Sequence, residues 1–201
     1  MGGTRFVGKA LVKKLIMKGY DVTVFTRGNR SLPKDVTHIK GDRNSDSIRQ
    51  LAGMKFEVII DSSGRSLEQT KRVVELTGHP SHRLLYLSSA GIYDDDDRWP
   101  LDEESLIDPS SRHIGKSETE KWLSINKIPF TSFRPTYIYG PGNYNPIEKW
   151  FFDRIVSNRP IPIPFDGSTI TQLGHVSDLA DAMTLCLEKE VSKNKIYNCF
   201  Y

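Results

Sequence analysis

The sequence predicts an α/β domain built on a doubly wound parallel sheet, with helices on both faces. Three observations indicate this fold class. Short apolar runs rich in β-branched residues alternate with amphipathic helical segments. A glycine-rich turn opens the first of these helical segments. The length of 201 residues fits one such domain, with at most a small second lobe.

The predicted strands are short apolar segments bounded by turn residues, and the predicted helices lie between them. The strands are "DVTVFT" (21–26), "THIKG" (37–41), "FEVIID" (56–61), "RLLYLSS" (83–89), "PFTSFRP" (129–135) and "KIYNCFY" (195–201). The helical segments cover residues 8–19, 45–53, 67–78, 111–124, 146–158 and 175–190. Because strands alternate with helices along most of the chain, the sheet should be parallel.

Both ends of the sequence predict neighbouring structure that the sequence itself does not contain. A phosphate-binding glycine turn follows a buried strand that aims it at the ligand, and only Met1 precedes the turn here. The last segment also has the pattern of a strand. We therefore expect the first strand of the sheet and a C-terminal part to lie outside this sequence.

Composition and charge narrow the classes of function that this sequence could have. Mean hydropathy is −0.44, no apolar run approaches the roughly 18 residues that span a bilayer, and no secretory signal is expected ahead of the turn. Residues 1–50 carry 11 Lys/Arg against 4 Asp/Glu, whereas residues 51–110 carry 6 against 12. A basic first quarter suits an anionic partner such as a dinucleotide or nucleic acid, although a solvated basic face has the same composition.

The glycine turn "GGTRFVG" (2–8) predicts a pyrophosphate site at the start of the first helix. Gly2 and Gly8 occupy the outer places of a G-x-x-G-x-x-G pattern, and Arg5 replaces the middle glycine. Small residues there let the backbone approach a phosphate at the positive end of a helix. Glycine turns also precede helices for structural reasons alone, so the order of the later elements is needed to support a site.

The end of the next strand predicts which dinucleotide is bound. An acidic residue there would bind the ribose 2′-OH of NAD, but this chain has Thr26 and Arg27. A cation fits a 2′-phosphate, which favours NADP over NAD, and Arg5 could join it. Arg27 could equally be an ordinary strand-end arginine. Asp42 could accept a hydrogen bond from the adenine amine or cap the helix after it.

The motifs "GGTRFVG", "YLSSAGIY", "RHIGK" and "FRPTYIYGPG", in this order, resemble the extended short-chain dehydrogenase/reductases, the epimerase/dehydratase group on a Rossmann-type fold. The resemblance covers essentially the whole chain. It implies that Ser89 is the serine that polarises the substrate oxygen and that Lys116 is the lysine of the Tyr-x-x-x-Lys pair. It also implies a dinucleotide site at Gly2, Gly3, Thr4, Arg5, Phe6, Gly8, Thr26, Arg27, Asp42, Lys116 and Pro135.

The place of the family's catalytic tyrosine is taken by Arg112. A guanidinium has no neutral form near pH 7, so it cannot serve as the general acid or base. His113 could titrate, but on a helix it would point about 100° away from Arg112. The residues therefore predict that the usual hydride-transfer mechanism is disabled.

A narrower resemblance follows from "RHIGKSETE", "RPTYIYGPGNYNPIEKWFFDRI", "RPIPIP" and "QLGHVSDLADA". These segments are similar to the chloroplast stem-loop-binding proteins and their cyanobacterial relatives. That resemblance implies binding of structured RNA, with endoribonuclease activity known in the group, and a location in the chloroplast stroma or the cyanobacterial cytoplasm. It also implies three parts: residues 1–140 as the dinucleotide-binding domain, 141–175 as a segment of a substrate lobe, and 176–201 as a returning helix and strand.

The spacing of Arg112 and Lys116 has two interpretations. Both cations could face the family's active-site cleft and meet phosphate, from a cofactor or from RNA. They could instead belong to a ladder of charges spaced by four residues, in which Asp108 and Glu120 neutralise them.

Further candidate chemistry lies in three other segments. The acidic stretch "YDDDDRWPLDEES" (93–105) could hold Mg²⁺ for phosphodiester cleavage, or it could be a solvated loop. The aromatic set Trp150, Phe151 and Phe152 could stack bases, but packing in a core or a homo-oligomer is expected for two of them. His175 and Asp178 are expected to be features of a helix start, so no resident metal site is predicted.

Three hypotheses of function follow. The first is an atypical Rossmann protein that binds, and could cleave, structured RNA, with a retained NADP pocket and no membrane association. The second is a sugar-nucleotide epimerase or dehydratase that uses a substitute acid. The third is a dinucleotide-sensing scaffold without enzymatic activity.

Overall fold

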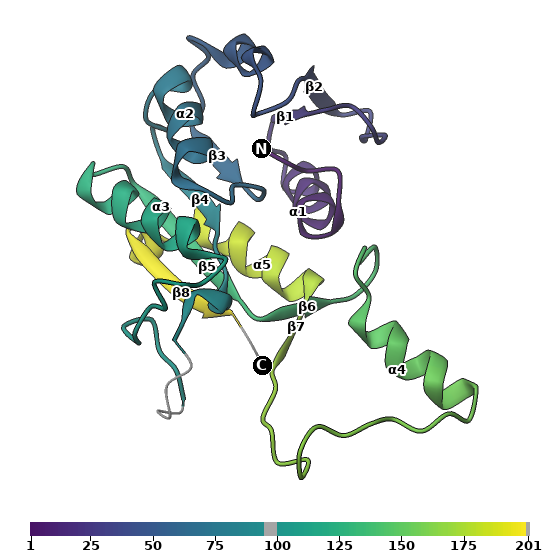
Figure 1. Ribbon diagram of the computed structural model, residues 1–201. Helices are drawn as coiled ribbons and strands as arrows, with labels where there is room; N and C mark the ends of the chain where they lie inside the picture. The colour runs from purple at the N-terminus through teal and green to yellow at the C-terminus, as the bar shows by residue number, and fades with distance from the viewer. Residues whose placement is uncertain (95–99, 200–201) are drawn as a thin grey trace.

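The structure, a computed structural model that describes residues 1–94 and 100–199, places parallel strands between two layers of helices (Figure 1). The strands are β1 (Val22–Thr26), β2 (Val36–Lys40), β3 (Val58–Asp61), β4 (Arg83–Leu87), β5 (Phe130–Pro135), β6 (Tyr137–Tyr139), β7 (Leu173–His175) and β8 (Lys195–Cys199). The helices are α1 (Phe6–Met17), α2 (Leu67–Thr77), α3 (Ile114–Ile125), α4 (Ile147–Val156) and α5 (Val176–Leu187), with short 3₁₀ helices η1 (Asp46–Leu51), η2 (Ala90–Ile92) and η3 (Glu190–Ser192).

The main sheet is parallel and has the strand order β3-β4-β5-β8. Strands β1 and β2 form a separate parallel pair, and no described strand bridges β1 and β3. The α/β fold class predicted from the sequence is confirmed. The break in the sheet lies beside the glycine turn, at the place where the sequence predicts a further strand.

Helices cover both faces of the sheet, as continuous apolar strands require. Helices α1 and α5 pack on one face, where Leu85 belongs to the same buried apolar cluster as Leu11 and Met183. Helices α2 and α3 pack on the other, against Leu84 and Tyr86. The alternation of neighbouring β4 residues between two cores is the two-residue period of a strand.

Two predicted helices differ in the structure. The segment at 111–124 becomes helical only at Ile114, because residues 110–113 form turns in which Ser111 Oγ accepts from the N–H of His113. The segment at 45–53 forms the 3₁₀ helix η1, whose start is capped by the Ser45 side chain. Asp42 does not cap it, so that alternative is wrong. The short strands β6 and β7 were not predicted.

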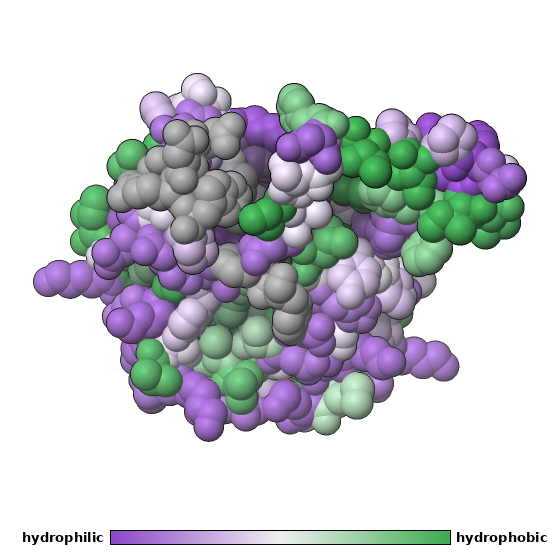
Figure 2. Space-filling model, turned by 90° about the horizontal axis from the view of Figure 1, so that it is seen from below, coloured by the Kyte–Doolittle hydropathy of each residue, from purple (hydrophilic) through white to green (hydrophobic). Residues whose placement is uncertain are grey.

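Residues 140–172 form an arm that carries α4 away from the sheet (Figure 1). No residue of α4 is buried. Trp150, Phe151 and Phe152 are all exposed, so of the two expected kinds of packing the core is wrong, and packing in a homo-oligomer stays a prediction. In Figure 2 hydrophobic side chains gather on the right, the side on which α4 lies. Among the described residues, no helix combines the length and apolarity needed to cross a membrane.

Candidate functional site

The candidate site lies where the parallel strands end, because parallel strands bring their carboxyl ends to one edge of a sheet. Thr26 and Asp61 are the last residues of β1 and β3, and the segments that follow β2, β4 and β5 carry Asp42, Ser89 and Thr136. The glycine turn joins this edge through Met1, whose backbone oxygen accepts from the N–H of Ser62 at 3.3 Å. Thr26, Asp42 and Ser89, which the sequence predicted as site residues, thus lie at one edge, together with Asp61 and Thr136, which it did not predict.

The glycine turn has the shape of a phosphate cradle. Gly2 and Gly3 have φ of +86° and +104°, which side chains other than glycine rarely adopt. A Cβ on Gly8 would lie 2.6 Å from the backbone nitrogen of Gly3, so only glycine allows the helix to pack this tightly on the turn. The first turn of α1 contains no acidic residue. Backbone N–H groups at a helix start bind phosphate oxygens, so this turn fits a pyrophosphate.

Arg5 and Phe6 of this turn both contact Tyr144, an aromatic residue of the arm at 140–172. The Arg5 guanidinium carbon lies 5.5 Å from the centre of the Tyr144 ring. The Phe6 ring meets the same ring edge to face, with centroids 6.5 Å apart. Tyr144 therefore ties the arm of residues 140–172 to the glycine turn. Sequence patterns did not reveal this contact, since the two segments lie far apart in the chain.

The ends of β1 and β2 present the predicted ribose and adenine positions. Thr26 Oγ1 lies 2.9 Å from Nε2 of His38, whereas Arg27 is exposed. Asp42 Oδ1 accepts from the backbone N–H of Asn44 at 2.9 Å and so orders its own loop. Within residues 1–94 and 100–199, no ion pair involves Arg27.

A buried ion pair that the sequence analysis missed supports this edge. Arg43 donates to both carboxylate oxygens of Asp61, at 2.8 and 2.7 Å. Asp61 also accepts from Thr70 Oγ1 and from the N–H of Gly64. Although burial opposes ionisation, these hydrogen bonds hold the pKa of Asp61 far below its usual value. A charged residue at the end of a buried strand was the available signal.

Lys116 points into the edge of the sheet. Its Nζ donates to the backbone oxygen of Leu87 and lies 5.4 Å from the centre of the Tyr86 ring. Burial lowers the pKa of Lys116 to about 8, and the neighbouring carboxylates of Asp61 and Glu120 only partly oppose the shift. The family's lysine position is therefore retained as a mostly buried amine beside β4.

Arg112 and His113 lie in the turn before α3, so helical spacing does not describe them. Arg112 is exposed, and its Nε donates to Nε2 of His113 at 3.0 Å. A Cβ on Gly91 would meet both the His113 ring, at 2.9 Å, and Ser89 Oγ, at 3.3 Å. The side chains of His113 and Ser89 thus both flank Gly91. The prediction that His113 points about 100° away from Arg112 is wrong, because both residues precede α3 and their side chains are hydrogen bonded. Burial, with help from Arg112 and Lys116, lowers the pKa of His113.

Two buried hydroxyl groups at this edge lack a hydrogen-bond partner among the described residues: Ser88 Oγ after β4 and Thr136 Oγ1 after β5. Ser89 itself accepts from the N–H of Gly91 at 3.1 Å, and Pro135 is buried as the last residue of β5. A buried hydroxyl usually has a partner, so these two groups fit a ligand that presents polar atoms to the edge. Together with the glycine cradle, they make the site fit a dinucleotide.

The predicted ladder of charges is not formed. Glu120 is 3% exposed and pairs with Arg134 Nη2 at 2.7 Å instead of with Lys116. Arg134 also donates to Tyr93 Oη and to the backbone oxygen of Glu103. Because Glu120 pairs with Arg134, the amine of Lys116 is held by the backbone oxygen of Leu87 and not by a carboxylate one turn away.

The acidic stretch supports no metal site within the described residues. Asp95, Asp96 and Asp97 lie outside them, so the candidate Mg²⁺ ligands there are not placed. Glu103 Oε1 accepts from the backbone N–H of Asn198 at 2.6 Å. His175 caps α5 by accepting from the N–H of Ser177, with Asp178 in the first turn, as predicted. Elsewhere along the described ranges, no three His, Cys, Asp or Glu side chains cluster as metal ligands.

The glycine turn at the start of α1, the polar groups at the carboxyl edge of a parallel sheet and the lysine beside β4 are features of the short-chain dehydrogenase/reductase class. The sequence of residues 1–199 matches the NAD dependent epimerase/dehydratase family. The chain belongs to that family.

The names of two similar proteins describe different functions. The chain is 42% identical, over 98% of its length, to the chloroplast stem-loop binding protein of 41 kDa b from Arabidopsis thaliana, and spans 57% of that protein. It is 26% identical, over 98% of its length, to UDP-glucose 4-epimerase from Corynebacterium glutamicum, of which it spans 73%.

Solved structures confirm the fold. The NAD complex of UDP-glucose 4-epimerase from Thermus thermophilus matches 99% of this chain and 76% of its own, with a TM-score of 0.76 at 18% identity. The epimerase Mth375 from Methanothermobacter thermautotrophicus matches 99% of this chain and 70% of its own, with a TM-score of 0.80 at 18% identity.

Proposed function

We propose that this chain is an RNA-binding member of the epimerase/dehydratase family that retains a dinucleotide pocket and has lost the usual hydride-transfer chemistry. The observation that carries the proposal is Arg112 at the position of the family's tyrosine. There it adds a permanent charge in the exposed turn before α3, the helix that carries Lys116. The similarity to a protein named for stem-loop binding supports the same function.

The loss of proton transfer follows from the groups around Ser89. Arg112 is always protonated, so it cannot take or give a proton near pH 7. His113 Nε2 accepts from Arg112, which leaves the proton of a neutral imidazole on Nδ1. A substrate at Ser89 would therefore meet a fixed cation where a reductase presents a phenol.

The RNA surface is proposed to include exposed cations of the first quarter of the chain. Arg5, Lys9 and Lys13 are exposed on or beside α1, and no ion pair holds them within the described residues. Lys14 and Lys18, on the same helix, instead pair with Asp181 and Glu188 of α5. Unpaired cations gain most from meeting phosphate, because counterions are released and no existing ion pair is broken.

The pocket is proposed to prefer NADP over NAD. The glycine cradle would hold the pyrophosphate, and exposed Arg27 after β1 would meet a 2′-phosphate by a charge-assisted bond. Lys116 would bind the nicotinamide ribose. A bound nicotinamide would supply hydride chemistry, but the residues around Ser89 would lack the matching proton donor.

A filter-binding titration with a stem-loop RNA at 50 and 200 mM salt, with and without NADP, tests the RNA proposal. If six or more phosphates are contacted, affinity should fall by about a thousandfold or more between these salt concentrations. Lys13→Gln should weaken binding and reduce the salt slope by about one, whereas the matched control Lys18→Gln should have a smaller effect, since Lys18 is already paired. Absent or salt-insensitive binding would remove the RNA proposal.

The same RNA preparation also tests whether the chain cleaves RNA. We propose that any endoribonuclease activity depends on added Mg²⁺, because paired carboxylates and a hydrated Mg²⁺ stabilise phosphodiester cleavage. Incubation of the bound stem-loop with Mg²⁺ or with EDTA, followed by gel analysis of the RNA, separates binding from cutting. From the relative's name we propose the chloroplast stroma or the cytoplasm of a cyanobacterium as the location.

A second candidate function is that of a sugar-nucleotide epimerase or dehydratase. The retained Ser89 and Lys116 positions favour it, as does the similarity to UDP-glucose 4-epimerase. Turnover of a UDP-sugar panel by the unaltered chain would support this function and refute the main proposal. If Arg112→Tyr alone gains turnover, one residue separates the two functions. Dinucleotide binding with neither RNA binding nor turnover would indicate a sensing scaffold.

A further inference from the structure

Basic side chains from two segments far apart in the sequence gather at the start of α3. Arg112 and His113 lie in the turn before this helix, and Arg65 lies in the loop between β3 and α2. A Cβ on Gly115, in the first turn of α3, would lie 2.7 Å from the backbone oxygen of Arg65. The helix and the loop are therefore in direct contact here. We call Arg65, Arg112 and His113 the arginine cluster.

The charges of the cluster act on one imidazole ring. Burial is the largest cause of the lowered pKa of His113. The positive charges of Arg112, Lys116 and Arg65 lower that pKa further. Arg112 also contacts the ring, since its Nε donates to His113 Nε2 at 3.0 Å. Like charges held this close repel one another, and an anion between them would turn the repulsion into attraction.

The cluster has no acidic partner within residues 1–94 and 100–199, where no ion pair involves Arg65 or Arg112. Asp61 and Glu120 are the carboxylates that act on neighbouring Lys116, and each of them pairs with a different arginine. A guanidinium fork without a carboxylate is suited to phosphate, whose oxygens accept two parallel N–H bonds.

Lys116 is not available as the second cation for such a phosphate. Its Nζ donates to the backbone oxygen of Leu87 and lies 5.4 Å from the centre of the Tyr86 ring. Arg65 and Arg112, by contrast, are both exposed. Tertiary structure therefore gives Arg112 a companion from another segment, in place of the lysine four residues along the chain.

Hydrogen bonds fix the backbone of both segments that carry the arginines. The N–H of Arg65 donates to Gln69 Oε1 at 2.9 Å. Ser111 Oγ accepts from the N–H of His113 at 3.0 Å and donates to the backbone oxygen of Gly91 at 2.7 Å. Cations on preorganised segments lose less conformational freedom when they bind a ligand, so more of the interaction energy appears as affinity.

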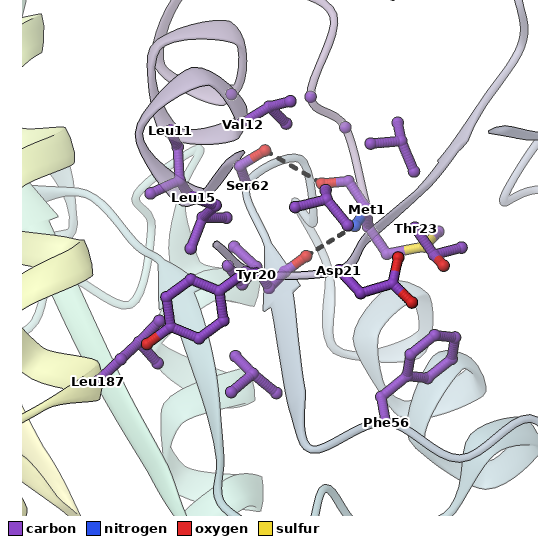
Figure 3. Close-up of a pocket in the computed structure, with 17 residues that line it drawn as sticks. Met1, Leu11, Val12, Leu15, Tyr20, Asp21, Thr23, Phe56, Ser62 and Leu187 are labelled. Atoms are coloured by element: carbon purple, nitrogen blue, oxygen red, sulfur yellow. Dashed lines mark hydrogen bonds between the residues drawn. The ribbon is translucent and has the colours of Figure 1, made fainter. Parts of the chain in front are cut away.

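The loop that carries Arg65 also contacts the glycine turn. Ser62, the first residue of this loop, donates its hydroxyl to the backbone oxygen of Met1 at 3.0 Å (Figure 3). Four residues of chain span at most about 14 Å, so the backbone at Arg65 lies no farther than that from Ser62. One RNA strand that meets the exposed cations beside the glycine turn therefore has the cluster within reach.

We propose that the arginine cluster binds one backbone phosphate of RNA, held between the guanidinium groups of Arg65 and Arg112. The cluster would be a second RNA contact at the carboxyl edge, so the proposal rests on the proposed function. It gives Arg112 a binding role at the position of the family's tyrosine. Phosphate contacts position a nucleic acid without reading its bases, so this contact should not select a sequence.

The test is a filter-binding titration of a stem-loop RNA against the full chain at several salt concentrations. Arg65→Gln/Arg112→Gln should weaken binding roughly tenfold or more, because charge-assisted hydrogen bonds are lost. It should also reduce the salt slope by about one. Since both arginines would hold the same phosphate, the losses from the two single variants should not add. The matched control Arg72→Gln should have a smaller effect, because Arg72 already pairs with Asp46.

The imidazole NMR signal of His113, identified by its absence in His113→Gln, gives a readout at the cluster itself. The stem-loop RNA should shift this signal in the unaltered chain and in Arg72→Gln, but not in Arg65→Gln/Arg112→Gln. Inorganic phosphate at the same phosphate concentration should shift it much less, because a free anion gains nothing from contacts elsewhere on the chain. An equal shift with inorganic phosphate would overturn RNA as the source of the phosphate.

The outcomes separate this proposal from the proposed function. If the unaltered chain binds RNA and Arg65→Gln/Arg112→Gln binds it equally well, the proposal is overturned and the proposed function stands. Additive losses from the two single variants would overturn the sharing of one phosphate. If the unaltered chain binds no RNA, both fail.

Discussion

The two sides of the carboxyl edge are built by different means. One side, which we call the nucleotide side, contains the glycine turn and the end of β1. There the turn from Gly2 to Gly8 is shaped by backbone geometry, and the cations Arg5 and Arg27 are exposed. On the side of β4 and β5, buried side chains carry the structure: Glu120 pairs with Arg134, and Lys116 donates to β4. The first side has few side-chain partners within the described residues, and the second has many.

Because the two sides are built differently, they should respond differently to substitution. A backbone cradle depends on the absence of side chains, so it is damaged by adding an atom. A buried ion pair is damaged by removing one partner, because the remaining charge is left without solvent or a counterion. Substitutions should therefore affect stability mainly on the side of β4 and β5 and ligand binding mainly on the nucleotide side.

Glu120→Gln should have the largest effect. It leaves the guanidinium of Arg134, which is 4% exposed, without its carboxylate. We expect a loss of about 3–5 kcal/mol in the free energy of unfolding, measured by urea denaturation. Glu118→Gln is the matched control on α3, since Glu118 is exposed, and should change stability by less than about 0.5 kcal/mol. Equal losses would show that the pair is not a buried one.

Gly8→Ala should weaken dinucleotide binding on the nucleotide side. Alanine normally stabilises a helix relative to glycine, but here its Cβ would lie 2.6 Å from the Gly3 nitrogen and displace the turn. We expect dinucleotide affinity, measured by calorimetry, to fall at least about tenfold, or roughly 1.4 kcal/mol. Met17→Ala, at the exposed end of the same helix, should leave that affinity unchanged. Unchanged affinity in Gly8→Ala would argue against the cradle.

Lys116 should make stability depend on pH. Its pKa is about 8 in the folded chain and near 10.5 when unfolded. Between these values the unfolded chain binds more protons, so stability rises with pH. We expect a rise of about 1 kcal/mol between pH 8 and 9 that is absent in Lys116→Met. Parallel pH profiles of the two proteins, from urea denaturation, would contradict the buried position of this amine.

Tyr144→Leu should have the smallest effect. It removes the ring that Arg5 and Phe6 contact, and exposed contacts of this kind contribute about 0.5–1 kcal/mol. Stability should fall by no more than that amount, whereas amide exchange in the loop at 140–145 should quicken. Tyr137→Leu, another exposed tyrosine, is the control. A larger loss of stability would mean that the arm contributes to the core.

The sequence predicted much of the fold but less of the site. Alternating apolar runs located β1 to β5, β8 and the helices, because those patterns depend on local periodicity. The start of α3 was placed too early, since Ser111 forms a turn that periodicity does not reveal. The site residues Gly8, Ser89 and Lys116 followed from motifs. The pair of Arg43 with Asp61 did not, because its members follow different strands.

By itself, the sequence determined what depends on local pattern: the class of fold, the glycines of the cradle, and an arginine that cannot release its proton at the tyrosine position. Tertiary structure alone decided which charges pair. Glu120 pairs with Arg134 and not with Lys116, and the side chains of His113 and Ser89 both flank Gly91. The physical reason is that pairing depends on burial and on contacts between distant segments, which spacing along the chain does not encode.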